Sequence, residues 1–179
     1  MKTLIDFALL IDRFNDRVAS VAKWSIAAAC AISAANAFVR YGFNFSSNAF
    51  LEIQWYLFAA CVMFGTAQVL RVNEHVRVDI LYNLYPTKGK VFVDIMGLSL
   101  FLMPMCLLII WLIIPLLTQQ FITGETSSNA GGLIRWPVTA TVPLGLGLLA
   151  LQGLSEIIKR VAWLQHKYEM DTHYERPLQ

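Results

Sequence analysis

Residues 91–117 read VFVDIMGLSLFLMPMCLLIIWLIIPLL, and this run contains a single charged side chain, Asp94. An apolar run of about 20 residues is long enough to cross the hydrocarbon core of a bilayer as an α-helix. At about 1.5 Å per residue this run would reach about 40 Å, so the helix must tilt or bend. We expect a bend at Pro104 or Pro115, because proline is the usual cause of a kink.

Three further stretches have the composition and length of a membrane span. They cover about 21–39, 49–70 and 138–158. Hydrophobic residues make up 57% of the chain and charged residues 15%, whereas a soluble domain carries about 25% charged residues. The sequence therefore predicts an all-α membrane protein with four transmembrane helices, which form a single domain over residues 1–179.

Residues 2–19 are too polar to cross a bilayer by themselves. Apolar side chains recur there every three or four residues, and aspartate and arginine side chains occupy other positions. This spacing predicts an amphipathic helix with one apolar stripe. We expect this helix to lie at the membrane interface or against a partner.

The basic residues predict how the spans are oriented. Of the 14 Lys and Arg residues, all but Arg40 and Arg135 lie in the N-terminal segment, in the 71–90 connection or in the 159–179 tail. Cytoplasmic segments of membrane proteins are enriched in Lys and Arg. The sequence therefore predicts that both termini and the 71–90 connection are cytoplasmic.

Acidic residues inside spans are costly, so each needs a partner. Two of them lie near predicted cytoplasmic ends, where a structural ion pair is the expected role. The candidate pairs are Asp94 with Lys88 or Lys90, and Glu156 with Lys159 or Arg160.

Glu52 lies about one turn inside the second span, on the predicted periplasmic side. Trp55 and Ala59 follow it at three- and four-residue spacing, which gives a mixed face that is typical of contact with protein rather than lipid. We expect the Glu52 carboxylate to be held by Arg40, by Arg135 or by a partner chain, with an ion or proton site as the alternative. Glu52, Trp55 and Ala59 are therefore candidate subunit-interface residues.

The sequence offers no catalytic, cofactor or metal site. The histidines lie outside the spans, at His75, His166 and His173, whereas haem ligation in a four-helix bundle needs histidines inside them. The cysteines lie inside apolar runs without paired spacing, which is typical of packing residues. A net charge of +2 is too small to suggest nucleic acid. We expect neither an enzyme nor a nucleic-acid partner.

The second span and its exit carry a family signal. Glu52 and Trp55 open this span, and at its end the chain reads NEHVRVD over residues 73–79. This pattern resembles the DctQ-like family, the small membrane subunit of TRAP (tripartite ATP-independent periplasmic) transporters. The stretch SSNAGGLIRWP, residues 127–137, is similar to the polar loop that precedes the last span in that family.

The resemblance implies a partner-dependent role in the bacterial inner membrane. It implies a large membrane subunit that holds the sodium and substrate sites, and a periplasmic binding protein that delivers an organic acid or related solute. The small subunit would brace the large one in the lipid bilayer and help dock the binding protein. His75 and Asp79 would form a structural motif at the cytoplasmic exit, with Asp79 accepting hydrogen bonds and His75 packing beside it.

Two other classes of protein remain as alternatives. A self-sufficient small multidrug or ion transporter needs a carboxylate near the midplane of the membrane, and Glu52 lies too near the surface for that role. A small four-helix membrane enzyme needs arginines and other polar residues that face a cofactor between the spans, and this sequence does not supply them.

Overall fold

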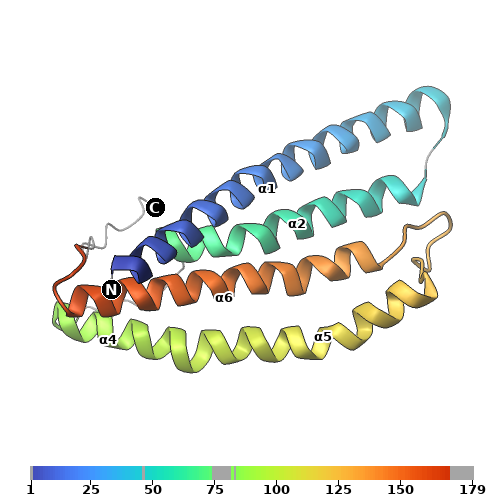
Figure 1. The fold of residues 1–179 in the computed structure, drawn as a ribbon. Helices are drawn as coiled ribbons and strands as arrows, with labels where there is room; N and C mark the ends of the chain where they lie inside the picture. Colours follow the sequence, from blue (N-terminus) through green and yellow to red (C-terminus); the bar gives the residue numbers. More distant parts are fainter. Residues whose placement is uncertain (1, 46, 74–81, 83, 170–179) are drawn as a thin grey trace.

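The computed structural model describes residues 2–45, 47–73, 82 and 84–169 of the chain. These residues form four long helical rods (Figure 1). The bounds are Lys2–Phe43 for α1, Asn48–Val72 for α2, Thr87–Gly97, Leu98–Leu102 and Met103–Thr123 for the continuous run of α4, η1 and α5, and Trp136–Leu164 for α6.

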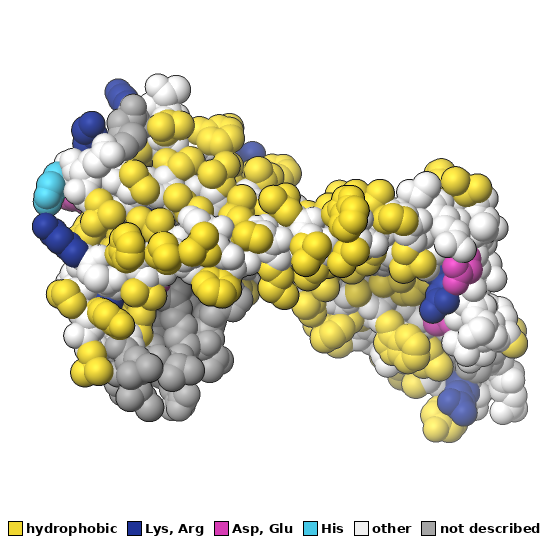
Figure 2. Space-filling model, turned by 90° about the horizontal axis from the view of Figure 1, so that it is seen from below, with side chains coloured by type: hydrophobic (Ala, Val, Ile, Leu, Met, Phe, Trp, Pro, Cys, Tyr) yellow, Lys and Arg dark blue, Asp and Glu magenta, His cyan; other side chains and the backbone are white. Residues whose placement is uncertain are grey.

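Each of the four rods is long and apolar enough to cross a membrane. Large apolar side chains point outward along them, including Phe101 and Trp111 at 75% and 70% exposure. Figure 2 shows apolar side chains over the middle of the molecule and charged side chains gathered at its two ends. Such a distribution is typical of helices whose surroundings are lipid. The prediction of an all-helical chain with four helices of spanning length is confirmed.

Helix α6 is the central element of the bundle. It packs against α1, α2 and α5, and α1 also packs against α2 along its length (Figure 1). Small residues permit the close approach of α2 and α6, because a Cβ atom at Gly145 would lie 2.6 Å from the Met63 carbonyl oxygen. A small residue that lets two backbones approach closely is a common feature of helix contacts in a membrane.

Both ends of the described chain lie at one end of the bundle. Helix α1 begins there, α2 ends there, α4 begins there and α6 ends there (Figure 1). The connections 44–47 and 124–135 lie at the opposite end. Hereafter the first is called the terminal end and the second the loop end. The prediction that the terminal end faces the cytoplasm stays a prediction.

Helix α1 joins two segments that the sequence analysis separated. Residues 2–19 and 21–39 lie in one helix of 42 residues, which would be about 63 Å long. The helix continues through residue 20 without a break, since it contains no proline and its only glycine is Gly42. The predicted location of residues 2–19 at the membrane interface stays a prediction.

The third rod is irregular where its prolines lie. A π-helical turn, Leu98–Leu102, comes directly before Pro104, and Pro115 lies inside α5. Figure 1 shows this rod curving along its length. Proline lacks the N–H group that would continue the helix, and its ring crowds the preceding turn. A π turn is a common local adjustment to such a disturbance.

Helix α2 has clear signals at both ends. The Ser47 hydroxyl accepts a hydrogen bond from the Ala49 N–H at 3.3 Å, which is the usual N-cap contact. Asn73 ends the helix in the left-handed conformation, with φ of 60°, as asparagine often does. Glu52 therefore lies in the second turn of α2, at the loop end of the bundle.

Candidate functional site

Glu52 is a buried carboxylate beneath the 124–135 loop. Its side chain is 3% exposed. The Asn129 side-chain amide donates to one carboxylate oxygen at 2.8 Å, and the Leu133 backbone N–H donates to the other at 2.6 Å. Hydrogen bonds to a charged acceptor are stronger than those between neutral groups. The carboxylate therefore fixes the loop over the start of α2.

The 124–135 loop folds back on itself like a short hairpin. Thr126 and Ile134 form an isolated antiparallel bridge. The Ser127 N–H donates to the Leu133 carbonyl at 2.9 Å. A Cβ atom at Gly132 would lie 2.6 Å from Ser127 Cβ, so only glycine fits at this position without a shift. This close turn brings the Leu133 N–H to Glu52.

Two more side chains of α2 hold the same loop. Asn48 donates to the Ala130 carbonyl at 3.1 Å, and the Tyr56 hydroxyl donates to the Ile134 carbonyl at 3.1 Å. Together with Glu52 these residues recur every four positions, so they share one face of the helix. The first three turns of this face of α2 therefore contact the loop.

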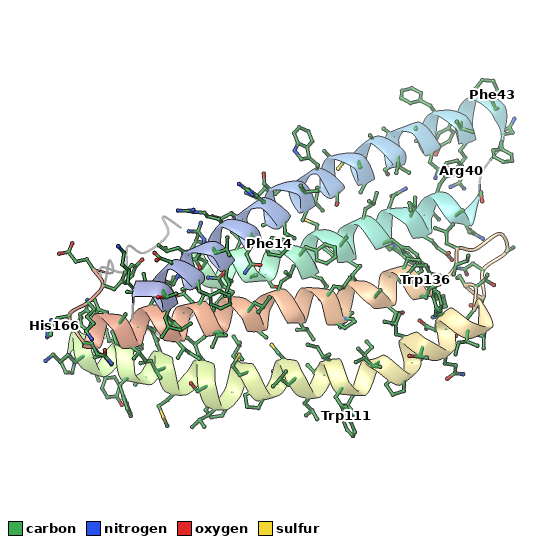
Figure 3. All side chains as sticks on the ribbon, in the orientation of Figure 1. Phe14, Arg40, Phe43, Trp111, Trp136 and His166 are labelled. Carbon is green, nitrogen blue, oxygen red and sulfur yellow. The ribbon has the colours of Figure 1, made fainter. Side chains whose placement is uncertain are left out.

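The loop is also tied to the helices on either side of it. Arg135 forms an ion pair with Glu125 at 2.8 Å. Trp136, the first residue of α6, packs edge-to-face on Phe121 of α5, with ring centroids 5.3 Å apart. Figure 3 shows Trp136 at the loop end. The contacts make a firm cap over this end of the bundle.

These contacts correct the predicted partner of Glu52. Arg40, Arg135 or a partner chain was expected to meet the carboxylate, but Arg135 pairs with Glu125 and the loop supplies the donors to Glu52. A backbone N–H and a side-chain amide can both donate to a carboxylate, and a search for basic partners does not find such donors.

The three candidate interface residues do not form one exposed patch. Glu52 is buried, Ala59 is half-buried and Trp55 is 66% exposed. Trp55 therefore points outward from the bundle while Glu52 points into it. A role of these residues in contact with another subunit stays a prediction.

A second polar cluster lies at the terminal end, around Asp12 of α1. The Asp12 carboxylate accepts hydrogen bonds from Ser155 at 2.7 Å and from Gln152 at 2.8 Å, and it pairs with Lys159 at 2.9 Å. Asn15 donates to the Gln152 side-chain oxygen at 2.8 Å. All five side chains are buried. The first turns of α1 are thus attached to the last turns of α6.

The cluster continues through charged residues toward α4. Glu156 pairs with both Lys159 and Arg160, as the sequence predicted. Arg160 in turn pairs with Asp94 of α4 at 3.2 Å, and Tyr82 donates to Asp94 at 3.0 Å. The sequence analysis considered only Lys88 and Lys90 as partners of Asp94, and it did not foresee the pairing with α6. Below, the Asp12 network means Asp12, Asn15, Asp94, Gln152, Ser155, Glu156, Lys159 and Arg160.

The role of Asp12 was not predicted, because its partners lie on a helix far away along the chain. A signal was present in α6, where Gln152, Ser155, Glu156 and Lys159 recur at three- and four-residue spacing. A polar stripe on a membrane helix indicates contact with polar groups of another helix. The polar groups that meet this stripe come from residues 2–19 of α1, where Asp12 and Asn15 are buried. Apolar side chains of the same segment, such as Phe7 and Phe14, are about half exposed. The predicted motif residues His75 and Asp79 lie outside the described residues.

The arrangement is suited to holding helices together rather than to chemistry. Within the described residues, no group of three His, Cys, Asp or Glu side chains could hold a metal ion. Between the two clusters, the helix segments 24–39, 53–70, 97–123 and 136–155 carry no charged side chain. The chain therefore provides no series of charged groups across its apolar middle.

One comparison with known proteins gives a match. A family model described as "Tripartite ATP-independent periplasmic transporters, DctQ component" matches residues 29–162. The matched region contains Glu52, the 124–135 loop and the α6 side of the Asp12 network, and it begins after Asp12 itself. No curated protein and no solved structure matches the chain.

Proposed function

Because this chain belongs to the DctQ family, the small membrane components of tripartite ATP-independent periplasmic (TRAP) transporters, we propose that it braces the large membrane subunit of such a transporter. The chain is a multi-pass membrane protein that works with other TRAP subunits, and its family consists of transporter components rather than enzymes. In this proposal the large subunit carries the moving parts, and this chain holds it in place in the bilayer.

The observation that carries the proposal is that the buried charges have partners within this chain. Glu52 accepts hydrogen bonds from the 124–135 loop. Ion pairs link four other buried residues: Asp12, Glu156, Lys159 and Arg160. Ionisable groups that serve an ion pathway face a cavity or a water-filled route. Groups that are paired within the chain stiffen it instead, and stiffness is what a brace requires.

The proposed arrangement places the loop end in the periplasm and the terminal end in the cytoplasm of a bacterial inner membrane. The capped loop end would then help to dock the periplasmic binding protein. Trp55 would contact the large subunit, because an exposed tryptophan supplies a large contact area. Ala59 would allow close approach on that side, and Glu52 would act indirectly by holding the loop. The coupling ion would be sodium and the solute an organic acid, and the large subunit would hold the binding sites for both.

Reconstitution tests this function. Liposomes would contain this chain alone, the large subunit alone or both, with the cognate binding protein and a labelled organic acid that it binds. We expect uptake driven by a sodium gradient only when both membrane subunits are present. Uptake by this chain alone would contradict the bracing function and would favour a self-sufficient transporter.

A further inference from the structure

A groove of about 410 Å³ runs between α1 and α2 in the half of the bundle nearer the terminal end. Its lining is apolar except for two residues: Arg17, Val18, Val21, Ala22, Ser25, Ala60 and Phe64. Ala22 is buried and Ala60 is half-buried, so small side chains form its floor. Val18 and Phe64 add bulkier walls. The groove is mostly apolar and is open to the surroundings of the helices.

Arg17 lies at one end of the groove with its charge available. Its side chain is exposed, and within the part of the chain that the structure describes no hydrogen bond or ion pair involves its guanidinium group. The neighbouring carboxylate, Asp16, is already paired with Arg71 at 2.8 Å. Arg13, one turn earlier on the same face of α1, is also exposed. The mouth of the groove is therefore basic.

The depth of Arg17 follows from the sequence of α1. The uncharged stretch 24–39 would cover about 24 Å, close to the thickness of the hydrocarbon core. Trp24, 75% exposed, marks the edge of this stretch, where tryptophan is enriched. Arg17 lies about 10 Å beyond Trp24 along the helix. This distance places the guanidinium at the level of lipid headgroups, while Ser25 and Ala60 lie at the level of acyl chains.

We propose that this groove binds one anionic phospholipid, with its phosphate on Arg17 and an acyl chain that passes Ala22 and lies along Ser25 and Ala60. The two ends of the groove match the two parts of such a lipid, since Arg17 lies in the headgroup layer and the end with Ser25 and Ala60 lies in the hydrocarbon layer. Arginine binds phosphate through two parallel hydrogen bonds. Arg13 adds attraction for an anionic lipid over a zwitterionic one. The proposal does not depend on the bracing function.

Photocrosslinking in the purified transporter complex tests this site. A photoactivatable phosphatidylglycerol would be added to the complex, and labelled peptides of this chain would be mapped. We expect labels on α1 near residues 18–25 and on α2 near residues 60–64. Arg17→Gln should reduce this labelling about fivefold, the effect of losing one basic contact with an anionic lipid. The matched control is Arg40→Gln, an exposed arginine on the same helix at the loop end, which should leave labelling unchanged.

Two further measurements test the apolar part of the site and distinguish a lipid from other occupants. Ala60→Leu fills the floor and keeps Arg17, so it should also reduce labelling. Unlabelled phosphatidylglycerol should compete, and phosphatidylcholine and inorganic phosphate should not. Equal labelling of the Arg17 and Arg40 variants would overturn the proposal, as would competition by inorganic phosphate. Crosslinking of Val21→Cys to another subunit, without lipid labelling of the groove, would show a protein occupant and would also overturn it.

Discussion

Among single residues, Glu52 has the clearest structural role. Both carboxylate oxygens accept hydrogen bonds from one loop, from the Asn129 side chain and the Leu133 backbone. Removing the carboxylate takes the acceptor away from the half-buried Leu133 N–H and from the Asn129 side-chain amide, which costs more when a donor is shielded from water. The role of Glu52 is thus to hold the 124–135 loop by accepting hydrogen bonds from it.

A leucine substitution should therefore release the loop. We expect Glu52→Leu to increase protease cleavage near Asn129 and to lower the thermal unfolding midpoint of the purified chain in detergent. Glu125→Gln is the control, because the Glu125–Arg135 pair is exposed and such pairs contribute little. If both variants behaved alike in the two measurements, Glu52 would not hold the loop.

Gly132 offers a steric test of the same loop. A Cβ atom there would lie 2.6 Å from Ser127 Cβ and 3.1 Å from a Glu52 oxygen. We expect Gly132→Ala to lower the free energy of unfolding by about 1–3 kcal/mol, the usual effect of overpacking. Gly147→Ala in α6 is the matched control, since a Cβ atom there meets nothing within 4 Å. It should be neutral or stabilising by up to about 1 kcal/mol, and the opposite ranking in denaturant titrations would refute the described loop geometry.

Among the elements, α1 differs most from its predicted form. The sequence indicated two segments because hydropathy changes near residue 20, yet hydropathy does not end a helix. The polar side of residues 2–19 meets the polar stripe of α6 through Asp12 and Asn15. This contact joins positions more than a hundred residues apart, so local periodicity gives no information about it.

The Asp12–Lys159 pair should hold the N-terminal half of α1 on α6. Lys159 keeps Glu156 as a partner when Asp12 is removed, but the buried Gln152 and Ser155 donors lose their acceptor, which costs about 1–3 kcal/mol. We expect Asp12→Leu to destabilise by this amount in unfolding titrations, and Asp12→Leu combined with Lys159→Leu to recover part of the loss. Asp16→Leu is the comparison, since the Asp16–Arg71 pair is about one-third exposed and should contribute less. A larger effect of Asp16→Leu than of Asp12→Leu would show that α2, rather than α6, holds this half of α1.

The number of spanning helices and the bend in the third rod were predictable from the sequence. Spanning helices follow from apolar length alone, and the π turn of the third rod lies next to Pro104, one of the two positions at which a bend was predicted. The candidate site was harder to predict. Glu52 was found because a carboxylate inside a span is unusual, but its donors come from a loop 77 and 81 positions away. Short-range spacing identifies the unusual residue and cannot identify a distant partner.

For the whole molecule, orientation in the membrane is the next property to test. The Lys and Arg distribution predicts that the terminal end faces the cytoplasm. The native cysteines would be replaced, and single cysteines would be introduced at Asn44 and Asn129. We expect both to react with a membrane-impermeant thiol reagent added to intact cells. A cysteine at Leu84 should react only after permeabilisation. The reverse pattern would invert the topology.

The central claim is that the buried charges of this chain stabilise its structure and do not carry the transported ion or solute. Sodium-driven uptake per assembled transporter complex tests this claim most directly in the Glu52→Gln variant, which keeps the shape of the side chain and some of its hydrogen bonding. Glu125→Gln is the control. The account predicts that uptake, divided by the amount of large subunit that copurifies, stays within about twofold of the unmodified chain, a change of less than about 0.5 kcal/mol. An intact complex of normal amount that has lost uptake would contradict it.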